Sequence, residues 1–261
     1  MTTYQTLDLK RENDVLEVIL NHKNGANTVS ITMLKELIQL ADWLRDEKGI
    51  NYVIFTNTGR FFSVGADLVE LVNDFTQAEA QSENIRRMQI VGQEMMRKLE
   101  SLEQITFAAI QGSAYGAGVA IAMTTDFRFM TESSVFNLPE TNVGLFLTWG
   151  CTPRLVKSVG AVKAKELIML CEDVSAEECL QLGLINKVVR KEEMKDVVYQ
   201  TIEKLRRKGP LSIRLTKKLV NASVAPNFGD ILINETELVE RVAISGEPAA
   251  KMNEFLKSKG K

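Results

Sequence analysis

The sequence has little of the residue types on which several common active sites depend. It contains one histidine, His22, and three cysteines among 261 residues. A cysteine nucleophile such as Cys151 would need a histidine to activate it, and most zinc sites also use histidine. His22 stands in the turn NHKNG, where we expect a surface residue. The sequence therefore disfavours both kinds of site.

The cysteines are also unsuited to a disulfide framework. Cys151, Cys171 and Cys179 are odd in number and lack the spacing of metal ligands. We expect three small packing residues in a reducing cytoplasm.

Long hydrophobic runs and an excess of one charge are absent as well. No apolar run approaches the roughly 20 residues needed to span a bilayer, and the N-terminus lacks a basic-then-apolar signal pattern. A net charge of −2 gives no reason to expect nucleic acid or an anionic membrane as a partner. We therefore expect a cytoplasmic α/β protein with a small-molecule ligand.

Apolar periodicity indicates alternating strands and helices. It predicts strands at 15–20, 51–56, 105–110 and 127–131, and helices at 30–46, 77–102 and 116–123. The strand–helix–strand order at the start predicts a right-handed crossover with parallel pairing. Strand, turn and helix recur at intervals of roughly 50 residues, compatible with a spiral of βαβ units.

The C-terminal part of the chain reads differently from the rest. Ser175 and Glu178 form a capping-box pattern that opens a short helix, with Gly183 as its stop. From Lys191 the chain reads as helices broken at Gly209-Pro210 and at 224–228. We predict an α/β core at 1–190 and a helical subdomain at 191–261.

Two glycine turns are candidates for holding a carbonyl oxygen. In FFSVGADL, Gly65 permits a sharp turn that could aim the Val64 amide into a pocket. In SAYGAGVAIAM, glycines flank Ala117 where a helix begins, and the first amides of a helix have no internal partner. Two such amides aimed at one oxygen form an oxyanion hole. The alternative is that the glycines only allow tight strand–helix packing.

Glu140, in FNLPETNVG, is the candidate acid–base residue. Pro139 cannot donate to a sheet ladder, so we expect it to end a strand and turn Glu140 off its edge. Apolar neighbours suggest partial burial, which would raise the carboxyl pKa and suit it to proton transfer. An exposed helix-start glutamate is the alternative.

These motifs together resemble the enoyl-CoA hydratase/isomerase (crotonase) superfamily. The matching segments are VLEVILNHKNGAN, FFSVGADL, QGSAYGAG, NLPETNVG and SAEECLQLGLINKVV. The resemblance implies a crotonase-like spiral of ββα/βαβ repeats with a C-terminal helical trimerisation region. It also implies an acyl-CoA thioester substrate, with no cofactor apart from the coenzyme A carried by that substrate, and a homotrimer or dimer of trimers.

The resemblance further assigns roles to residues. It implies that the amides of Val64 and Ala117 form the oxyanion hole beside Glu140, and that the neighbouring subunit's C-terminal helix caps the coenzyme A channel. The substrate-binding residues that we take from it are Lys23, Asn24, Gly25, Ala26, Val64, Gly65, Ala66, Asp67, Leu68, Tyr115, Gly116, Trp149, Phe255 and Lys257.

The sequence departs from this family at one informative position. Hydratases of the family carry a second glutamate near the start of the glycine-rich helix, where this chain has Ala120. A single carboxylate suffices for a 1,3-proton shift, so we predict an isomerase that moves a double bond from Δ3 to Δ2. The alternatives are a hydratase, hydratase-lyase or decarboxylase, with Tyr115, Trp149 or a water in place of the missing glutamate, and a catalytically weak binding or scaffold subunit.

The segment FLTWGCTPRL is a second departure, because many hydratases have a proline- and glycine-rich loop there. Phe146 and Trp149 could wall the acyl pocket, or the segment could be a packed hydrophobic loop. Ala117 replaces a frequent glycine, but its amide remains.

Overall fold

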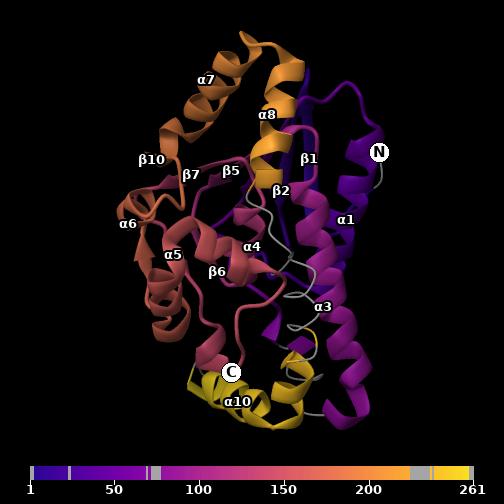
Figure 1. The fold of residues 1–261 in the computed structure, drawn as a ribbon, viewed down its shortest axis with the longest axis vertical. Helices are drawn as coiled ribbons and strands as arrows, with labels where there is room; N and C mark the ends of the chain where they lie inside the picture. The colour runs from indigo at the N-terminus through magenta and orange to yellow at the C-terminus, as the bar shows by residue number, and fades with distance from the viewer. Residues whose placement is uncertain are drawn as a thin grey trace.

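Two β-sheets form the centre of the molecule, and helices cover them (Figure 1). The computed structural model describes residues 3–22, 25–68, 70–71, 78–223, 236 and 238–258. The larger sheet has the strand order β1-β2-β3-β5-β7-β10. Its strands are β1 (Leu7–Glu12), β2 (Val15–Leu20), β3 (Tyr52–Asn57), β5 (Ile105–Ile110), β7 (Phe127–Thr131) and β10 (Lys187–Val189). Only β1 runs antiparallel to its neighbour; the other strand pairs are parallel.

The central strands of this sheet are those that the sequence predicted. Every residue of β3 and β5 is buried, as expected for parallel strands covered on both faces. The predicted parallel crossover from β2 to β3 through helix α1 (Ile31–Asp46) is confirmed. β1 was not predicted, because as an edge strand it is mostly polar and exposed (LDLKRE).

The smaller sheet has the order β4-β6-β8-β9 and is built from very short strands. They are β4 (Phe61–Ser63), β6 (Ser113–Tyr115), β8 (Val135–Asn137) and β9 (Val174–Ser175). β4, β6 and β8 follow β3, β5 and β7 in the chain, so each turn of the spiral adds one strand to each sheet. β4 and β6 were predicted as parts of the glycine turns, because three residues are too few to show a periodicity.

Helices α3 (Ala78–Glu100), α4 (Ala117–Met123), α5 (Cys151–Leu170) and α6 (Ala176–Gln181) follow the strands. α1 and α3 lie side by side, and α4 is wholly buried. The predicted cap of α6 is confirmed, because the Ser175 side chain accepts from the Glu178 N–H, and Gly183 has a positive φ of 72°. The interpretation of FLTWGCTPRL as one loop was wrong in its second half, where Cys151 begins α5 and Pro153 fits the first turn.

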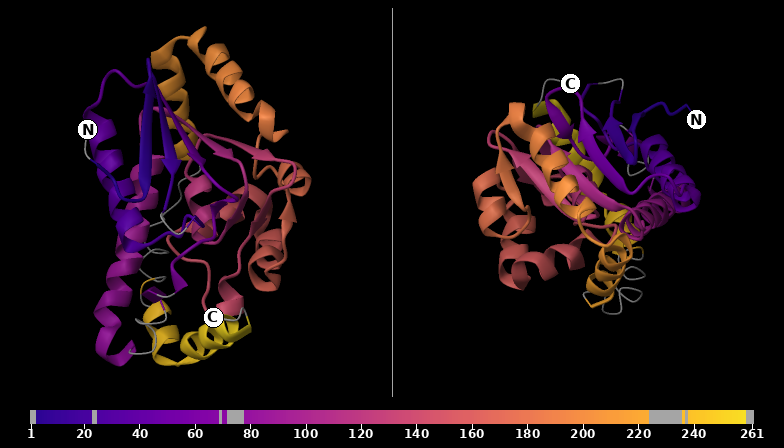
Figure 2. Two further views of the ribbon diagram at one scale, coloured as in Figure 1. Left: turned by 180° about the vertical axis from the view of Figure 1, so that it is seen from behind. Right: turned by 90° about the horizontal axis from the view of Figure 1, so that it is seen from above.

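The C-terminal helices lie at both ends of the molecule. α7 (Met194–Arg206) follows the short 3-10 helix η2 (Lys191–Glu193) and packs Met194, Val198 and Ile202 onto strands of the large sheet. α8 (Pro210–Ser223) and α10 (Glu247–Ser258) lie at opposite ends of the long axis (Figures 1 and 2).

The predicted break at Gly209-Pro210 is confirmed, since α8 begins at Pro210. The break at 224–228 lies outside the described residues, and the domain division at residue 190 stays a prediction. No helix in the described part of the chain is both long and apolar enough to cross a membrane.

Candidate functional site

The candidate site lies where three neighbouring parallel strands of the small sheet end. β4 ends at Ser63, β6 at Tyr115 and β8 at Asn137, and β6 pairs with both of the others. The two glycine turns follow β4 and β6, and the Pro-Glu step follows β8. Because the carboxyl ends of adjacent parallel strands meet at one edge of a sheet, the fold brings all three motifs together.

Close contacts at glycines show how tightly the motifs meet. A Cβ on Gly116 would lie 2.6 Å from Glu140 Oε1, and one on Gly65 would lie 2.9 Å from the Tyr115 carbonyl oxygen. A Cβ on Gly118 would lie 2.7 Å from Cβ of Ser63. Gly65 and Gly116 also have positive φ angles, of 90° and 45°. Glycine is therefore required both for the turns and for the approach of the carboxylate.

Glu140 begins the 3-10 helix η1 (Glu140–Val143), and its carboxyl group faces the second glycine turn. As predicted, the strand ends before Pro139, which precedes η1. Glu140 Oε2 is buried and has no hydrogen-bond partner among the described residues. Burial raises the pKa of Glu140 from its ordinary 4.5 to about 7, although a hydrogen bond from its own backbone N–H acts in the opposite direction. The carboxyl group can therefore both accept and return a proton near neutral pH.

The two predicted oxyanion amides differ in their surroundings. Ala117 is the first residue of α4, so its N–H has no partner within that helix. Its nitrogen would be 3.7 Å from a Cβ on Gly65, which places it between the two turns. The Val64 N–H donates to the Ala26 carbonyl oxygen at 3.1 Å. The Ala117 amide is thus presented at the site, whereas the Val64 amide would have to exchange its present acceptor for a ligand.

The predicted coenzyme A segments lie side by side. Residues 26–29 run along residues 64–67, with Val29 N–H bonded to the Gly65 carbonyl at 2.8 Å and Ala66 bridged to Val29. Asp67 accepts from Glu70 N–H at 3.3 Å, and Leu68 and Gly25 follow at the two ends. Lys23 and Asn24 lie outside the described residues.

Asn27 holds these segments together. It was not predicted as a site residue. It is buried, with a positive φ of 52°. Its side chain accepts from His22 N–H and donates to the Phe61 carbonyl, while its carbonyl accepts from the Ser63 hydroxyl at 2.7 Å. An asparagine two residues after Gly25, in a turn, was the available signal.

The three aromatic residues near the predicted site have different surroundings. Tyr115 ends β6 and packs edge-to-face on Phe61, with ring centroids 6.3 Å apart. Trp149 is buried with its indole against Gly92 of α3, and its Nε1 has no hydrogen-bond partner among the described residues. Phe146 packs on a separate apolar cluster that includes Val143 of η1. The acyl-pocket role of Trp149 stays a prediction.

The chain's own C-terminal helix covers this side of the site, where the resemblance implied a helix from a neighbouring subunit. α10 packs against η1 so closely that a Cβ on Gly144 would lie 3.1 Å from Pro248. Phe255 is half-buried on the cluster that includes Val143, Ala66 and Leu68, whereas Lys257 is exposed. A helix already seated on η1 gives Phe255 an apolar neighbourhood without a second copy.

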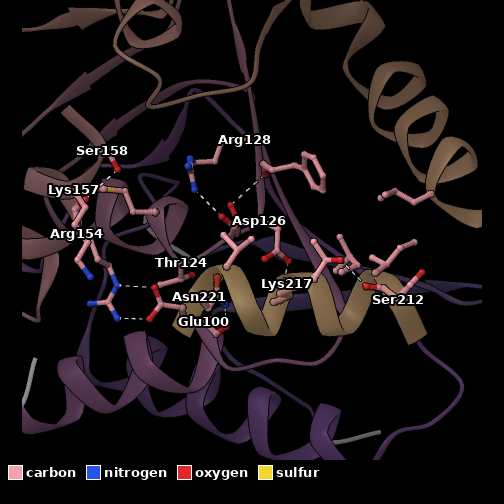
Figure 3. A pocket seen from close by; sticks show the side chains of 18 of the residues that line it. Glu100, Thr124, Asp126, Arg128, Arg154, Lys157, Ser158, Ser212, Lys217 and Asn221 are labelled. Atoms are coloured by element: carbon pink, nitrogen blue, oxygen red, sulfur yellow. Dashed lines mark hydrogen bonds and ion pairs between the residues drawn. The ribbon is translucent and has the colours of Figure 1, made fainter. Parts of the chain in front are cut away.

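A cavity elsewhere in the molecule contains none of the predicted site residues. It has a volume of about 720 Å³ and lies between α8, the start of α5 and the start of β7 (Figure 3). Arg154 pairs with Glu100 at 2.6 Å, and Lys217 pairs with Asp126 at 2.7 Å. Arg128 donates to two backbone carbonyls. The acidic groups in this cavity are engaged by cations, so the cavity offers no unpaired carboxylate for proton transfer.

The described residues contain no group of three or more His, Cys, Asp or Glu side chains placed to hold a metal ion. All three cysteines are buried and unbridged, as predicted for packing residues.

Comparisons with known proteins agree with this geometry. A family model described as enoyl-CoA hydratase/isomerase matches residues 10–254. The short-chain-enoyl-CoA hydratase of Clostridium acetobutylicum is 30% identical over 230 residues, which cover 88% of this chain and 86% of that protein. The crotonyl-CoA hydratase of Syntrophomonas wolfei subsp. wolfei is 27% identical over 257 residues, covering 98% and 96%.

The fold has a close match among solved structures. The crystal structure of an enoyl-CoA hydratase from Mycobacterium avium subsp. paratuberculosis K-10 matches with a TM-score of 0.85 at 21% identity, covering 97% of this chain and 100% of that one. This likeness confirms the predicted crotonase-like α/β fold.

Proposed function

Since the chain belongs to the enoyl-CoA hydratase/isomerase family, whose members act on acyl-CoA thioesters, we propose that it transfers a proton at C2 of an enoyl-CoA by means of Glu140. The observation that carries the proposal is the carboxyl group of Glu140 against the Gly116-Ala117 turn, with Oε2 buried and without a hydrogen-bond partner among the described residues. The Ala117 amide would hold the thioester oxygen as negative charge develops on it. The acid would exchange the proton on the adjacent carbon.

Hydration of the double bond is the first candidate reaction. Two of the relatives, 30% and 27% identical over most of the chain, are a short-chain-enoyl-CoA hydratase and a crotonyl-CoA hydratase. In this reaction the oxygen of a water bonds to C3 as the double bond opens, Glu140 gives its proton to C2, and the proton that the water loses returns to Glu140.

A shift of the double bond from Δ3 to Δ2 is the second candidate, and Ala120 favours it. Ala120 is buried within α4, so this position supplies no second carboxylate to activate a water. Glu140 would then remove a proton from C2 and return it at C4, with the Ala117 amide stabilising the dienolate between the two steps.

Mass spectrometry of the products tests the proposal and separates the two reactions. The protein is incubated with a 2-enoyl-CoA and, separately, with a 3-enoyl-CoA. Hydration adds the mass of one water to the first substrate, whereas isomerisation leaves the mass of the second unchanged and moves its double bond. In D2O, hydration places deuterium at C2, whereas isomerisation by one carboxyl can return the substrate's own proton to C4. Failure to convert either ester would contradict the proposal.

We also propose that the chain assembles as a homotrimer or a dimer of trimers. The proposal is supported by an apolar stripe on α8, where Leu211, Leu215 and Leu219 are half to two-thirds exposed at four-residue spacing. Sedimentation at micromolar concentration measures the mass, and a monomer there would contradict the assembly.

A further inference from the structure

Polar side chains on both sides of Glu140 are bonded to the same end of α5. Asn137 precedes Glu140 by three residues, at the end of β8, and Thr141 follows it in η1. Their partners all lie between Ile168 and Asp173, where α5 ends. We call this set of contacts the α5 clamp.

Asn137 joins the clamp to the glycine turn. Its Nδ2 donates to the Cys171 carbonyl and to Asp173 Oδ1, both at 2.8 Å. Since both partners are acceptors, the amide must present its NH₂ group to them. Its backbone carbonyl accepts from Gly116 N–H at 2.9 Å. One buried residue therefore connects the end of α5 to the turn that presents the Ala117 amide.

Thr141 holds η1 from the other side of Glu140. Its Oγ1 lies 3.1 Å from the Ile168 carbonyl, 3.4 Å from the Met169 carbonyl and 2.9 Å from Cys171 Sγ. The last carbonyls of a helix have no partner within it. The hydroxyl therefore satisfies carbonyl groups that α5 leaves open and fixes η1 against them.

The end of α5 has a conformation suited to this task. Cys171 adopts left-handed backbone angles, with φ 55° and ψ 32°, which residues other than glycine, asparagine and aspartate rarely take. This conformation ends the helix and coincides with the contacts of the Cys171 carbonyl with Asn137 and of its thiol with Thr141.

We propose that Asn137 and Thr141 are positioning residues, which fix the Glu140 carboxylate over Gly116 by clamping β8 and η1 to the end of α5. The inference rests on the proposed role of Glu140. Neither side chain is hydrogen-bonded to the Glu140 carboxylate in the described part of the chain. Both therefore act through the backbone on either side of Glu140. Loss of the clamp lets the carboxylate move away from the turn and towards water.

The test replaces the hydroxyl of Thr141 without changing the side chain's shape. We expect Thr141→Val to lower kcat by about 10- to 100-fold, the scale of a misplacement near 1 Å, with KM within about twofold of the wild type. The limb of the pH–rate profile that belongs to Glu140 should also move to lower pH, because a better hydrated carboxyl has a pKa closer to 4.5. Thr141→Ser keeps the hydroxyl and should restore both properties.

Two further variants separate positioning from folding. Thr201 of α7 makes the same kind of bond, from its hydroxyl to the Val197 carbonyl at 2.9 Å, so Thr201→Val is the matched control and should leave kcat and the pH profile unchanged. Asp173 is exposed, and Asp173→Ala removes one acceptor from Asn137 without disturbing the core. It should shift the same pH limb by a smaller amount, and it carries the test if Thr141→Val does not fold.

The outcomes of this inference and of the proposed function are distinct. If Glu140→Gln keeps full activity, the proposed function fails. If Glu140→Gln is inactive while folded Thr141→Val and Asp173→Ala keep the wild-type kcat and pH profile, only the clamp is overturned. A lower melting temperature with an unchanged profile would also overturn it, because that is the signature of a structural role alone.

Discussion

The carboxyl groups of the Glu140 site and of the cavity beside α8 differ in their partners. In the cavity, Asp126 accepts from Lys217 and from Thr106, and Glu100 accepts two bonds from Arg154. At the site, one oxygen of Glu140 has no partner, and the pKa of that carboxyl is raised to about 7.

The difference separates carboxylates that hold the fold from one that can change its protonation state. Loss of the cation from a buried ion pair would leave the remaining charge uncompensated. An unpartnered buried carboxyl group passes between its two forms near neutrality. The cavity beside α8 is therefore less suited to proton transfer than the Glu140 site.

Glu140→Gln should have the largest effect, a loss of activity without a loss of stability. We expect turnover of an enoyl-CoA to fall by about a thousandfold, within the range for loss of a general acid–base group, while binding of the ester, measured by calorimetry, persists. The variant should unfold at the same or a higher temperature than the wild type. An ionised Glu140 is disfavoured by burial, so the wild type loses stability as pH rises from 4.5 to about 7. The stability gained by the variant should therefore be larger at pH 8 than at pH 5.

Asp126→Asn should do the reverse and lower stability with little effect on chemistry. It leaves the ammonium of Lys217, only 8% exposed, without its carboxylate, which should cost about 3 kcal/mol in urea-induced unfolding. The control is Glu166→Gln, which breaks the exposed pair with Lys163 and should leave stability nearly unchanged. The contrast between the two regions would be lost if Asp126→Asn abolished turnover in a protein of normal stability.

The pH dependence of the wild type should show the smallest effect. It identifies most directly whether Glu140 acts as a base or as an acid. Removal of the C2 proton of a 3-enoyl-CoA needs the carboxylate, so this rate should fall about tenfold per pH unit below pH 7. Delivery of a proton to C2 during hydration needs the acid, so that rate should fall above pH 7. Initial rates between pH 5 and pH 9 measure both, and a limb near pH 4.5 would contradict the burial of Glu140.

Local sequence was sufficient for the parts of the site that lie within one turn or strand end. Glu140 after Pro139, and the glycines at 65 and 116, carry their signal in the adjacent residues. The long buried strands were equally legible, because runs such as ITFAAI are apolar throughout.

The parts that depend on distant partners could not be predicted. Asn137 and Thr141 take their partners about 30 residues further along the chain, and the start of α5 at Cys151 was hidden by a segment that reads as a loop. The three-residue strands of the small sheet owe their existence to pairing, not to composition. α10 resting on its own chain depends on a contact between Gly144 and Pro248, about 100 residues apart.

The pairing of β6 with β8 has a geometric consequence for the chemistry. Tyr115 is paired with Asn137, so the amide turn and the acid start from neighbouring strands, about 4.8 Å apart. That separation is set by backbone hydrogen bonding between the strands. It therefore fixes the distance between the group that holds the oxygen and the group that moves the proton. Side chains lining an acyl group can therefore be exchanged to fit a different substrate while the spacing that the reaction needs is kept.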